Sequence, residues 1–156
     1  MPRDETGCIT ILMADDDADD RMLTAEAMKE SRLGNSFRFV EDGQELMEYL
    51  TRTGDYANAD APRPGLILLD LNMPRKDGRQ ALREIKGNPE LRRIPVVILT
   101  TSKAEEDVLR SYDLGANSFI SKPVTFDGLV EIVRTVGHYW FSIVELPSEK
   151  GVASHV

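Results

Sequence analysis

The chain has 156 residues, of which 41% are hydrophobic and 29% are charged, and its formal net charge at pH 7 is −8. This length predicts one globular domain with a single core, and the negative charge argues against non-specific binding to nucleic acids or anionic membranes. No apolar run approaches the ~20 residues that span a bilayer, and the first residues lack the apolar stretch of a secretory signal. Cys8 is the only cysteine, which excludes an internal disulfide and fits a reducing compartment, so we expect a cytoplasmic protein.

Apolar runs of β-forming residues alternate with helical patterns along the chain. We predict strands at 10–14, 36–40, 66–70, 95–100 and 117–121, and helices at 18–33, 43–52, 78–87, 104–114 and 126–141. This alternation predicts an α/β fold, in which a parallel sheet has helices on both faces because the crossovers are right-handed. Residues 53–64 are rich in turn formers and lack periodicity, so we expect a long surface loop there.

Residues at the predicted helix ends support these bounds. Gly34 and Gly115 can end the first and fourth helices, and Thr125 can cap the start of the last one. Residues 105–107 are acidic and fall near the positive N-terminus of the fourth helix. We therefore predict one domain over residues 6–147, with flexible ends at 1–5 and 148–156.

Polar residues follow four of the predicted strands. The first strand is followed by Asp15 and Asp16, and the third ends in Asp70. The fourth ends in Thr100, and the fifth is followed by Lys122. Ligands in open α/β sheets bind outside the carboxyl ends of the strands. Carboxylates, a hydroxyl and an ammonium at this edge predict a site for a divalent cation and a phosphoryl group.

These elements, in this order, resemble the receiver domain of two-component response regulators. The resemblance extends from about residue 10 to residue 141, and Met73-Pro74 and Asp77-Gly78 after Asp70 strengthen it. It implies a flavodoxin-like, doubly wound, five-stranded parallel sheet of order 2-1-3-4-5 with five helices. It also implies a phosphoacceptor that catalyses its own phosphorylation and dephosphorylation, not an enzyme that acts on a separate substrate.

The resemblance implies a role for each carboxylate of the site. Asp70 would be the nucleophile that a sensor histidine kinase phosphorylates. Asp16, Asp70 and the backbone carbonyl of Asn72 would bind Mg²⁺ directly, and Asp15 would act through water. Oxygen ligands suit Mg²⁺, and the lack of His and Cys in the four motifs disfavours zinc.

The resemblance also implies a switch. Lys122 and Mg²⁺ would hold the phosphoryl oxygens, and the Thr100 hydroxyl would move toward the phosphoryl group. Phe119 would then turn inward, and the surface of the fourth helix, fifth strand and fifth helix would change; plain core packing is the alternative for Phe119. Thr101 stands where many receivers have Ala or Gly, and its branched side chain would narrow access to the phosphoryl group.

The first predicted helix carries a candidate dock for the kinase. Leu23, Ala27 and Met28 form an apolar arc that fits the core. Met22 and Ala25 then face outward beside the acidic pair, and we expect the histidine kinase to bind there. A chance exposed methionine is the alternative.

The last predicted helix continues into an apolar extension. That extension, with the long loop before the third strand and residues 99–103, resembles the single-domain regulators associated with phytochromes. The resemblance implies a phytochrome kinase as the partner and a homodimer joined by C-terminal arms, whose apolar residues here are Trp140, Phe141, Ile143, Val144 and Leu146. A tail folded on its own domain is the alternative. Only nine residues follow Pro147, so we expect output through protein contacts or onward phosphotransfer, not through nucleic acid.

Two other classes of function remain open. A haloacid-dehalogenase-type phosphatase also uses an Asp nucleophile with Mg²⁺, but its nucleophile follows the first strand in Asp-x-Asp-x-Thr/Val. Residues 15–19 lack the Thr or Val of that motif, and turnover of a phosphate ester would indicate this class. A scaffold that works without phosphate is disfavoured because each residue of the receiver motifs is present.

Overall fold

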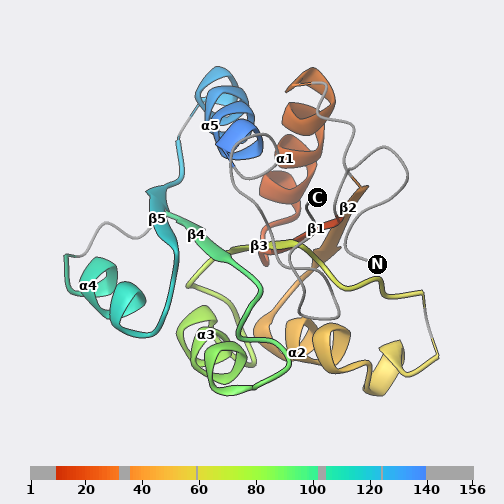
Figure 1. The fold of residues 1–156 in the computed structure, drawn as a ribbon. Coiled ribbons are helices and arrows are strands. Elements are labelled where there is room, and N and C mark those ends of the chain that lie inside the picture. Colours follow the sequence, from red (N-terminus) through yellow and green to blue (C-terminus); the bar gives the residue numbers. More distant parts are fainter. Residues whose placement is uncertain (1–9, 32–35, 59, 102–104, 124, 140–156) are drawn as a thin grey trace, which may run out of the picture.

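The computed structural model describes residues 10–31, 36–58, 60–101, 105–123 and 125–139. Five parallel strands form one sheet in the order β2-β1-β3-β4-β5 (Figure 1). The strands are β1 (Thr10–Ala14), β2 (Ser36–Val40), β3 (Leu66–Leu69), β4 (Val96–Thr100) and β5 (Ser118–Ser121). The helices are α1 (Ala18–Ser31), α2 (Gly43–Thr51), α3 (Gly78–Gly87), α4 (Glu105–Asp113) and α5 (Phe126–His138). The predicted flavodoxin-like fold with order 2-1-3-4-5 and five helices is confirmed.

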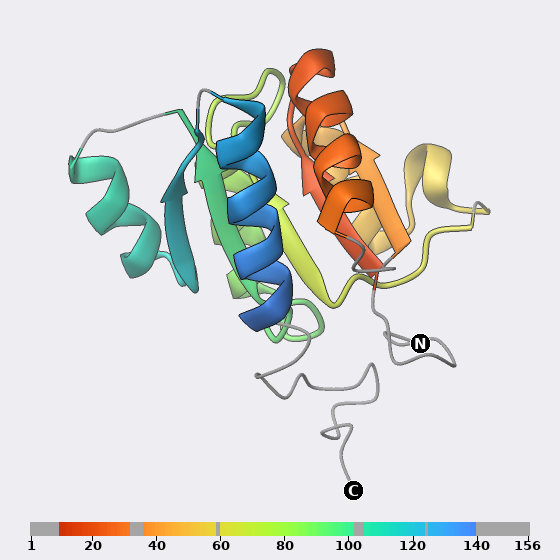
Figure 2. The same cartoon turned by 90° about the horizontal axis from the view of Figure 1, so that it is seen from above.

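The helices cover the two faces of the sheet unequally. α1 and α5 lie side by side on one face, and α2 and α3 lie on the other (Figures 1 and 2). α4 lies beside the edge strand β5 and contacts the sheet there (Figure 1). The carboxyl ends of β1 and β3, where the strand order reverses, therefore lie between the two helical layers.

Alternation along each strand divides the core into two clusters. In β1, Leu12 and Ala14 pack toward α2 and α3, whereas Ile11 and Met13 pack toward α1 and α5. All five residues of β1 are buried, because a central parallel strand is covered on both faces. This two-sided burial explains why the strands read as continuous apolar runs in the sequence.

Several element ends differ from the predicted ones. β3 ends at Leu69, so Asp70 follows the strand instead of ending it. Gly115 has φ +106° just beyond α4, and the side chain of Thr125 accepts a hydrogen bond from the Gly128 N–H at 3.0 Å. The predicted caps at these two positions are confirmed, whereas Gly34 lies outside the described residues.

The loop predicted at residues 53–64 is more structured than expected. It begins with a short 3₁₀ helix, η1 (Gly54–Tyr56). The Tyr49 hydroxyl of α2 donates to the Pro62 carbonyl at 2.8 Å, and Ala61 is buried. The Tyr56 and Tyr49 rings meet edge to face with centroids 5.2 Å apart. The aromatic side chains thus pack the loop onto α2, which turn-forming residues alone do not reveal.

The apolar arc of α1 is displaced from the predicted one. Leu23 is 40% exposed, whereas Thr24 is 1% exposed and lies in the interior with Ala27 and Met28. The prediction that Leu23 enters the core is therefore wrong, because the buried arc passes through a threonine that a purely apolar pattern overlooks. None of the described helices combines the length and apolar character that a membrane span requires.

Candidate phosphoacceptor and metal site

Backbone hydrogen bonds fix the two carboxylates that follow the central strands. The N–H of Asp15 donates to the Val40 carbonyl at 3.1 Å, and the N–H of Asp70 donates to the Ala14 carbonyl at 3.0 Å. Each residue thus continues the ladder of its strand by one step. Asp15 is fully buried and Asp70 is 7% exposed, so both side chains stand in a fixed, largely dry position.

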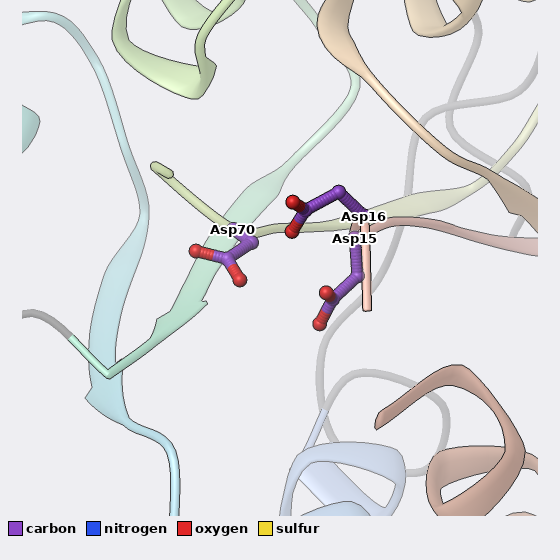
Figure 3. A group of neighbouring side chains, drawn as sticks. All are labelled: Asp15, Asp16 and Asp70. Atoms are coloured by element: carbon purple, nitrogen blue, oxygen red, sulfur yellow. The ribbon is translucent and has the colours of Figure 1, made fainter. Parts of the chain in front are cut away.

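Three carboxylates meet at this edge of the sheet. Ligand oxygens of Asp15, Asp16 and Asp70 all lie within 4.8 Å of one another (Figure 3). Asp16 is exposed, whereas the other two are buried. A cluster of oxygen ligands with one open side suits a hard divalent cation such as Mg²⁺ or Mn²⁺.

Lys122 supplies positive charge to the cluster. Its Nζ donates to Oδ2 of Asp15 at 2.7 Å, to Oδ2 of Asp20 at 2.7 Å and to Oδ2 of Asp70 at 3.1 Å. The lysine side chain is only 7% exposed. Burial alone would lower the pKa of Lys122, but the hydrogen bonds and charges of these carboxylates raise it above its ordinary value. The ammonium is therefore held in its charged form inside the site.

The charge balance of Asp15 explains why a further cation fits. Burial raises the pKa of its carboxyl above the ordinary value, and the negative charge of Asp70 adds to this rise. Hydrogen bonds from Lys122 and from the Asp17 N–H act in the opposite direction. One ammonium thus only partly offsets the buried negative charge, and a divalent cation would relieve the remainder.

Both carboxylate oxygens of Asp70 have partners. Oδ1 accepts from the Thr100 hydroxyl at 2.7 Å and from the Asn72 N–H at 3.0 Å. Oδ2 accepts from Lys122. The Thr100 hydroxyl is therefore hydrogen-bonded to the Asp70 carboxylate in this structure. A group attached to that carboxylate would lie close to the hydroxyl.

Gly78 lets α3 begin directly behind Asp70. A Cβ at position 78 would overlap the carbonyl oxygen of Asp70 and approach the Cα of Leu71 to 2.7 Å. The Gly78 N–H donates to the Leu71 carbonyl at 2.9 Å, and the Asp77 side chain caps α3 by accepting from the Gln80 N–H at 3.0 Å. Gly78 thus allows the start of α3 to pack closely against Asp70 and Leu71, and Asp77 caps the same helix.

The loop between β3 and α3 is held by an ion pair that the sequence did not indicate. Arg75 has φ +63°, a left-handed conformation that is uncommon for a residue other than glycine. Its guanidinium donates to Asp42 Oδ2 at 2.9 Å and to Oδ1 at 3.1 Å. Asp42 also caps α2, so one carboxylate fixes both a helix start and the loop beside the site.

The remaining predicted residues differ in how far they are buried. Asn72 and Thr101 are exposed. Phe119 is partly buried and packs against the core cluster on the α2 and α3 side. Met22 is 60% exposed and Ala25 is partly buried on α1. The predicted arm residues, Trp140, Phe141, Ile143, Val144 and Leu146, lie outside the described residues.

Asp20 is the site residue that the sequence reading missed. It belongs to α1 and contacts Lys122, although an acidic residue in the first turn of a helix is usually explained by the helix dipole. The only signal in the sequence is the density of charge, since five acids fall between Asp15 and Asp20.

Comparisons with known proteins agree with this geometry. The response regulator receiver domain family matches residues 11–134. The response regulator Rcp1 of Synechocystis sp. (strain PCC 6803) is 44% identical over 138 residues, which cover 88% of this chain and 92% of Rcp1.

Two solved structures have the same fold. The Mn²⁺-bound form of Rcp1 matches with 43% identity and a TM-score of 0.82, covering 89% of this chain and 99% of that one. The phosphorylated cyanobacterial phytochrome response regulator RcpA matches with 46% identity and a TM-score of 0.83, covering 89% and 98%. The haloacid-dehalogenase alternative is therefore wrong. The chain belongs to the response regulator receiver domain family and is homologous to response regulators of phytochrome signalling.

Proposed function

We propose that this protein accepts a phosphoryl group on Asp70 from the phosphohistidine of a sensor histidine kinase and signals through altered protein contacts. The observation that carries the proposal is the arrangement around Asp70, where the Thr100 hydroxyl lies 2.7 Å from Oδ1 and Lys122 Nζ lies 3.1 Å from Oδ2. A buried carboxylate held between a hydroxyl and an ammonium is ready for a group with anionic oxygens.

The transfer exchanges one bond to phosphorus for another. A carboxylate oxygen of Asp70 attacks the phosphorus, so an O–P bond forms while the P–N bond of phosphohistidine breaks. The electron pair of that bond goes to the imidazole, which leaves as the neutral ring when its other nitrogen carries a proton. In dephosphorylation, water attacks the phosphorus, inorganic phosphate leaves and the Asp70 carboxylate is restored. Lys122 and Thr100 would donate to the phosphoryl oxygens in both reactions, the transfer to Asp70 and the hydrolysis by water.

We assign Mg²⁺ as the cation of the site. Asp16, Asp70 and the Asn72 carbonyl would bind it directly, and Asp15 would act through water. When bound, the ion would offset the repulsion between the carboxylates and the incoming phosphoryl oxygens. The all-oxygen cluster supports this assignment, as does the Mn²⁺-bound form of the relative Rcp1.

The proposed switch joins the site to the surface around β5. Thr100 would move its hydroxyl from Asp70 to a phosphoryl oxygen, and Phe119 would turn further inward. Thr101 stands next to Thr100 and is exposed, so its branched side chain would limit access to the phosphoryl group. The surface of α4, β5 and α5 would then carry the signal.

We propose a phytochrome-type histidine kinase as the partner, docked on α1 around Met22 and Ala25. The large exposed fraction of Met22, 60%, supports this dock. The similarity to RcpA, which is described as a phytochrome response regulator, supports the class of kinase. We also place this protein in the cytoplasm, a reducing compartment that the single cysteine of the chain fits.

We further propose that the domain extends over residues 6–147 and that its arm, residues 141–147, joins two copies into a homodimer. The family match over residues 11–134 supports the extent of the domain. The apolar residues after His138 support the arm, because an isolated tail cannot bury them well.

Intact-mass measurement after incubation with Mg²⁺ and acetyl phosphate tests the phosphoacceptor role. We expect the parent to gain one phosphoryl group and Asp70→Asn to gain none, because an amide is a poor nucleophile. Asp127→Asn, which changes an exposed acid of α5, is the matched control and should label like the parent. Labelling of Asp70→Asn would overturn the assignment, and a parent that never labels would favour a scaffold that works without phosphate.

A further inference from the structure

Asp20 brings a fourth carboxylate to the site, and it comes from a helix instead of a strand end. Its Oδ2 lies 2.7 Å from Lys122 Nζ, as close as that of Asp15 and closer than that of Asp70 at 3.1 Å. The Asp20 side chain is 29% exposed, compared with 0% for Asp15 and 8% for Asp70. Of the three carboxylates that accept a hydrogen bond from Lys122, Asp20 is therefore the most exposed to water.

Local structure fixes Asp20 in this position. The Asp17 side chain caps α1 by accepting from the N–H groups of Asp19 at 2.9 Å and Asp20 at 3.3 Å. Arg21, the next residue, donates from Nη1 to the Asp15 carbonyl at 2.7 Å. The first turn of α1 is thus tied to the end of β1, and this holds the Asp20 carboxylate over the lysine.

The three N–H donors of the Lys122 ammonium match its three carboxylate partners. A phosphoryl group on Asp70 adds anionic oxygens beside the Oδ2 that Lys122 binds here. The bond to Oδ2 can pass to one phosphoryl oxygen, but a second donation from the ammonium to the phosphoryl group requires the release of Asp15 or Asp20. Asp15 is fully buried and would be left without its cation at a high desolvation cost. Asp20 can be solvated when it is released from Lys122. Its release therefore costs less free energy than the release of Asp15.

We propose that Asp20 is a positioning residue that holds Lys122 over Asp70 before phosphorylation and competes with the phosphoryl group for it. This inference rests on the proposed phosphorylation of Asp70. Because Asp20 and the proposed kinase dock share α1, release of Asp20 would also free the first turn of α1 from the β5–α5 loop. Phosphorylation would thereby reach the face that the kinase binds.

Binding of beryllofluoride, a phosphoryl mimic, with Mg²⁺ tests the competition by calorimetric titration. We expect Asp20→Asn to bind the mimic about fivefold more tightly than the parent, since one charged hydrogen bond no longer opposes it. Asp19→Asn removes the same charge from the same exposed turn without touching Lys122, so it measures the general electrostatic effect. Asp20→Glu keeps a carboxylate and should return the affinity toward that of the parent.

A metal-free measurement gives an independent readout. The side-chain resonances of Lys122 should shift in Asp20→Asn and stay unchanged in Asp19→Asn, because only the first variant replaces a charged acceptor of the ammonium by a neutral one. Equal effects of the two variants on beryllofluoride affinity, or an unshifted Lys122 in Asp20→Asn, would overturn the role of Asp20 while phosphorylation of the parent still stands. A parent that neither labels with acetyl phosphate nor binds beryllofluoride would overturn the proposed function and this inference together.

Discussion

Asp16 differs from the other two acids of the cluster in its surroundings. Asp15 and Asp70 are buried against Lys122, whereas Asp16 is exposed. Without a cation, Asp16 should not stabilise the fold, because its exposed carboxylate lies within 4.8 Å of two buried ones of the same charge. With a cation, Asp16 should matter, because a proposed direct ligand binds only the folded state.

Asp16→Asn should separate metal binding from folding. At ten times its dissociation constant, Mg²⁺ should raise the free energy of unfolding of the parent by about 1.4 kcal/mol. The variant should be at least as stable as the parent without metal, because it carries one charge less in the acidic cluster, and it should lose most of the gain that Mg²⁺ gives. Urea unfolding with and without Mg²⁺ measures both quantities, and Asp19→Asn is the control that keeps the gain. An unchanged Mg²⁺ effect in Asp16→Asn would remove this residue from the ligands.

Asp42 combines a helix cap with an ion pair. Its Oδ1 accepts from the Glu45 N–H at 2.8 Å, and Arg75 binds both of its oxygens. Burial alone would raise the pKa of Asp42, but Arg75 and the Glu45 N–H lower it below its ordinary value of 3.8. Such a group stabilises the fold above the unfolded-state pKa, and the contribution is lost as the pH falls through the folded-state pKa.

We expect Asp42→Asn to lower the free energy of unfolding by about 1 kcal/mol at pH 7, because asparagine keeps the cap but loses the pair with Arg75. The difference from the parent should shrink as the pH falls below 3.8, the ordinary pKa of the group. Asp77→Asn changes the cap of α3 in the same way and should stay close to the parent. Urea unfolding over this pH range checks the prediction, and a difference that does not vary with pH would contradict it.

The residues of the site were predictable to different degrees. Asp15, Asp70 and Lys122 follow apolar strands, and their grouping follows from parallel strands ending at one edge. The Asp20 contact with Lys122 joins residues 102 positions apart, and the Arg75 pair with Asp42 joins residues 33 positions apart. No local pattern marks such pairs, because they depend on how a helix and a loop are placed in three dimensions.

The helix α4 lies beside the edge strand β5 and contacts the sheet there (Figure 1). The Arg79 guanidinium of α3 donates to Asp107 Oδ1 at 3.0 Å and Oδ2 at 2.8 Å. The Phe119 N–H of β5 donates to the Tyr112 hydroxyl at 3.2 Å. These contacts place α4 where a change at β5 would reach it.

Arg79→Ala should loosen α4 more than α3. We expect the amides of α4 to exchange with solvent about fivefold faster, as a loss of about 1 kcal/mol of local stability implies. Arg83→Ala, one turn further along α3 and exposed, is the matched control and should leave α4 unchanged. Hydrogen exchange measured by mass spectrometry compares the two variants. Equal exchange rates of the α4 amides in Arg79→Ala and Arg83→Ala would contradict the stabilising role of the Arg79–Asp107 ion pair.

Element types followed from the sequence more readily than element ends and helix faces. Continuous apolar runs and right-handed crossovers predicted the parallel sheet with helices on both faces, and the resemblance to receiver domains implied the strand order that the structure has. The buried arc of α1 includes Thr24 instead of Leu23, and the loop after α2 packs through Tyr49 and Tyr56. Both differences arise because Thr and Tyr side chains have apolar and polar parts, and tertiary packing decides whether they are buried. A pattern of apolar residues alone does not predict their burial.

For the molecule as a whole, the arm hypothesis predicts a homodimer. Phe141, Ile143, Val144 and Leu146 place apolar side chains beyond the end of α5, and a symmetric partner would bury each arm by using one interface twice. Phosphorylation would change the strength of the dimer only as far as its two states differ in affinity for the partner.

Sedimentation of the full chain and of a chain ending at His138 tests this hypothesis. We expect the full chain to be dimeric at micromolar concentration and the shortened chain to be monomeric. Ile143→Asp in the full chain should weaken the dimer without removing any residue of the arm. A monomeric full chain, or a shortened chain that stays dimeric, would exclude the arm as the interface.

The central claim is that the phosphoryl group is attached to Asp70, and chemical trapping locates it directly. Borohydride reduces an acyl phosphate to an alcohol, so the modified aspartate becomes homoserine and can be found by peptide mass spectrometry. After treatment with Mg²⁺ and acetyl phosphate, we expect homoserine at position 70. Homoserine at position 15, 16 or 20 instead, or a gain in mass without homoserine at position 70, would contradict the assignment of Asp70 as the phosphoacceptor.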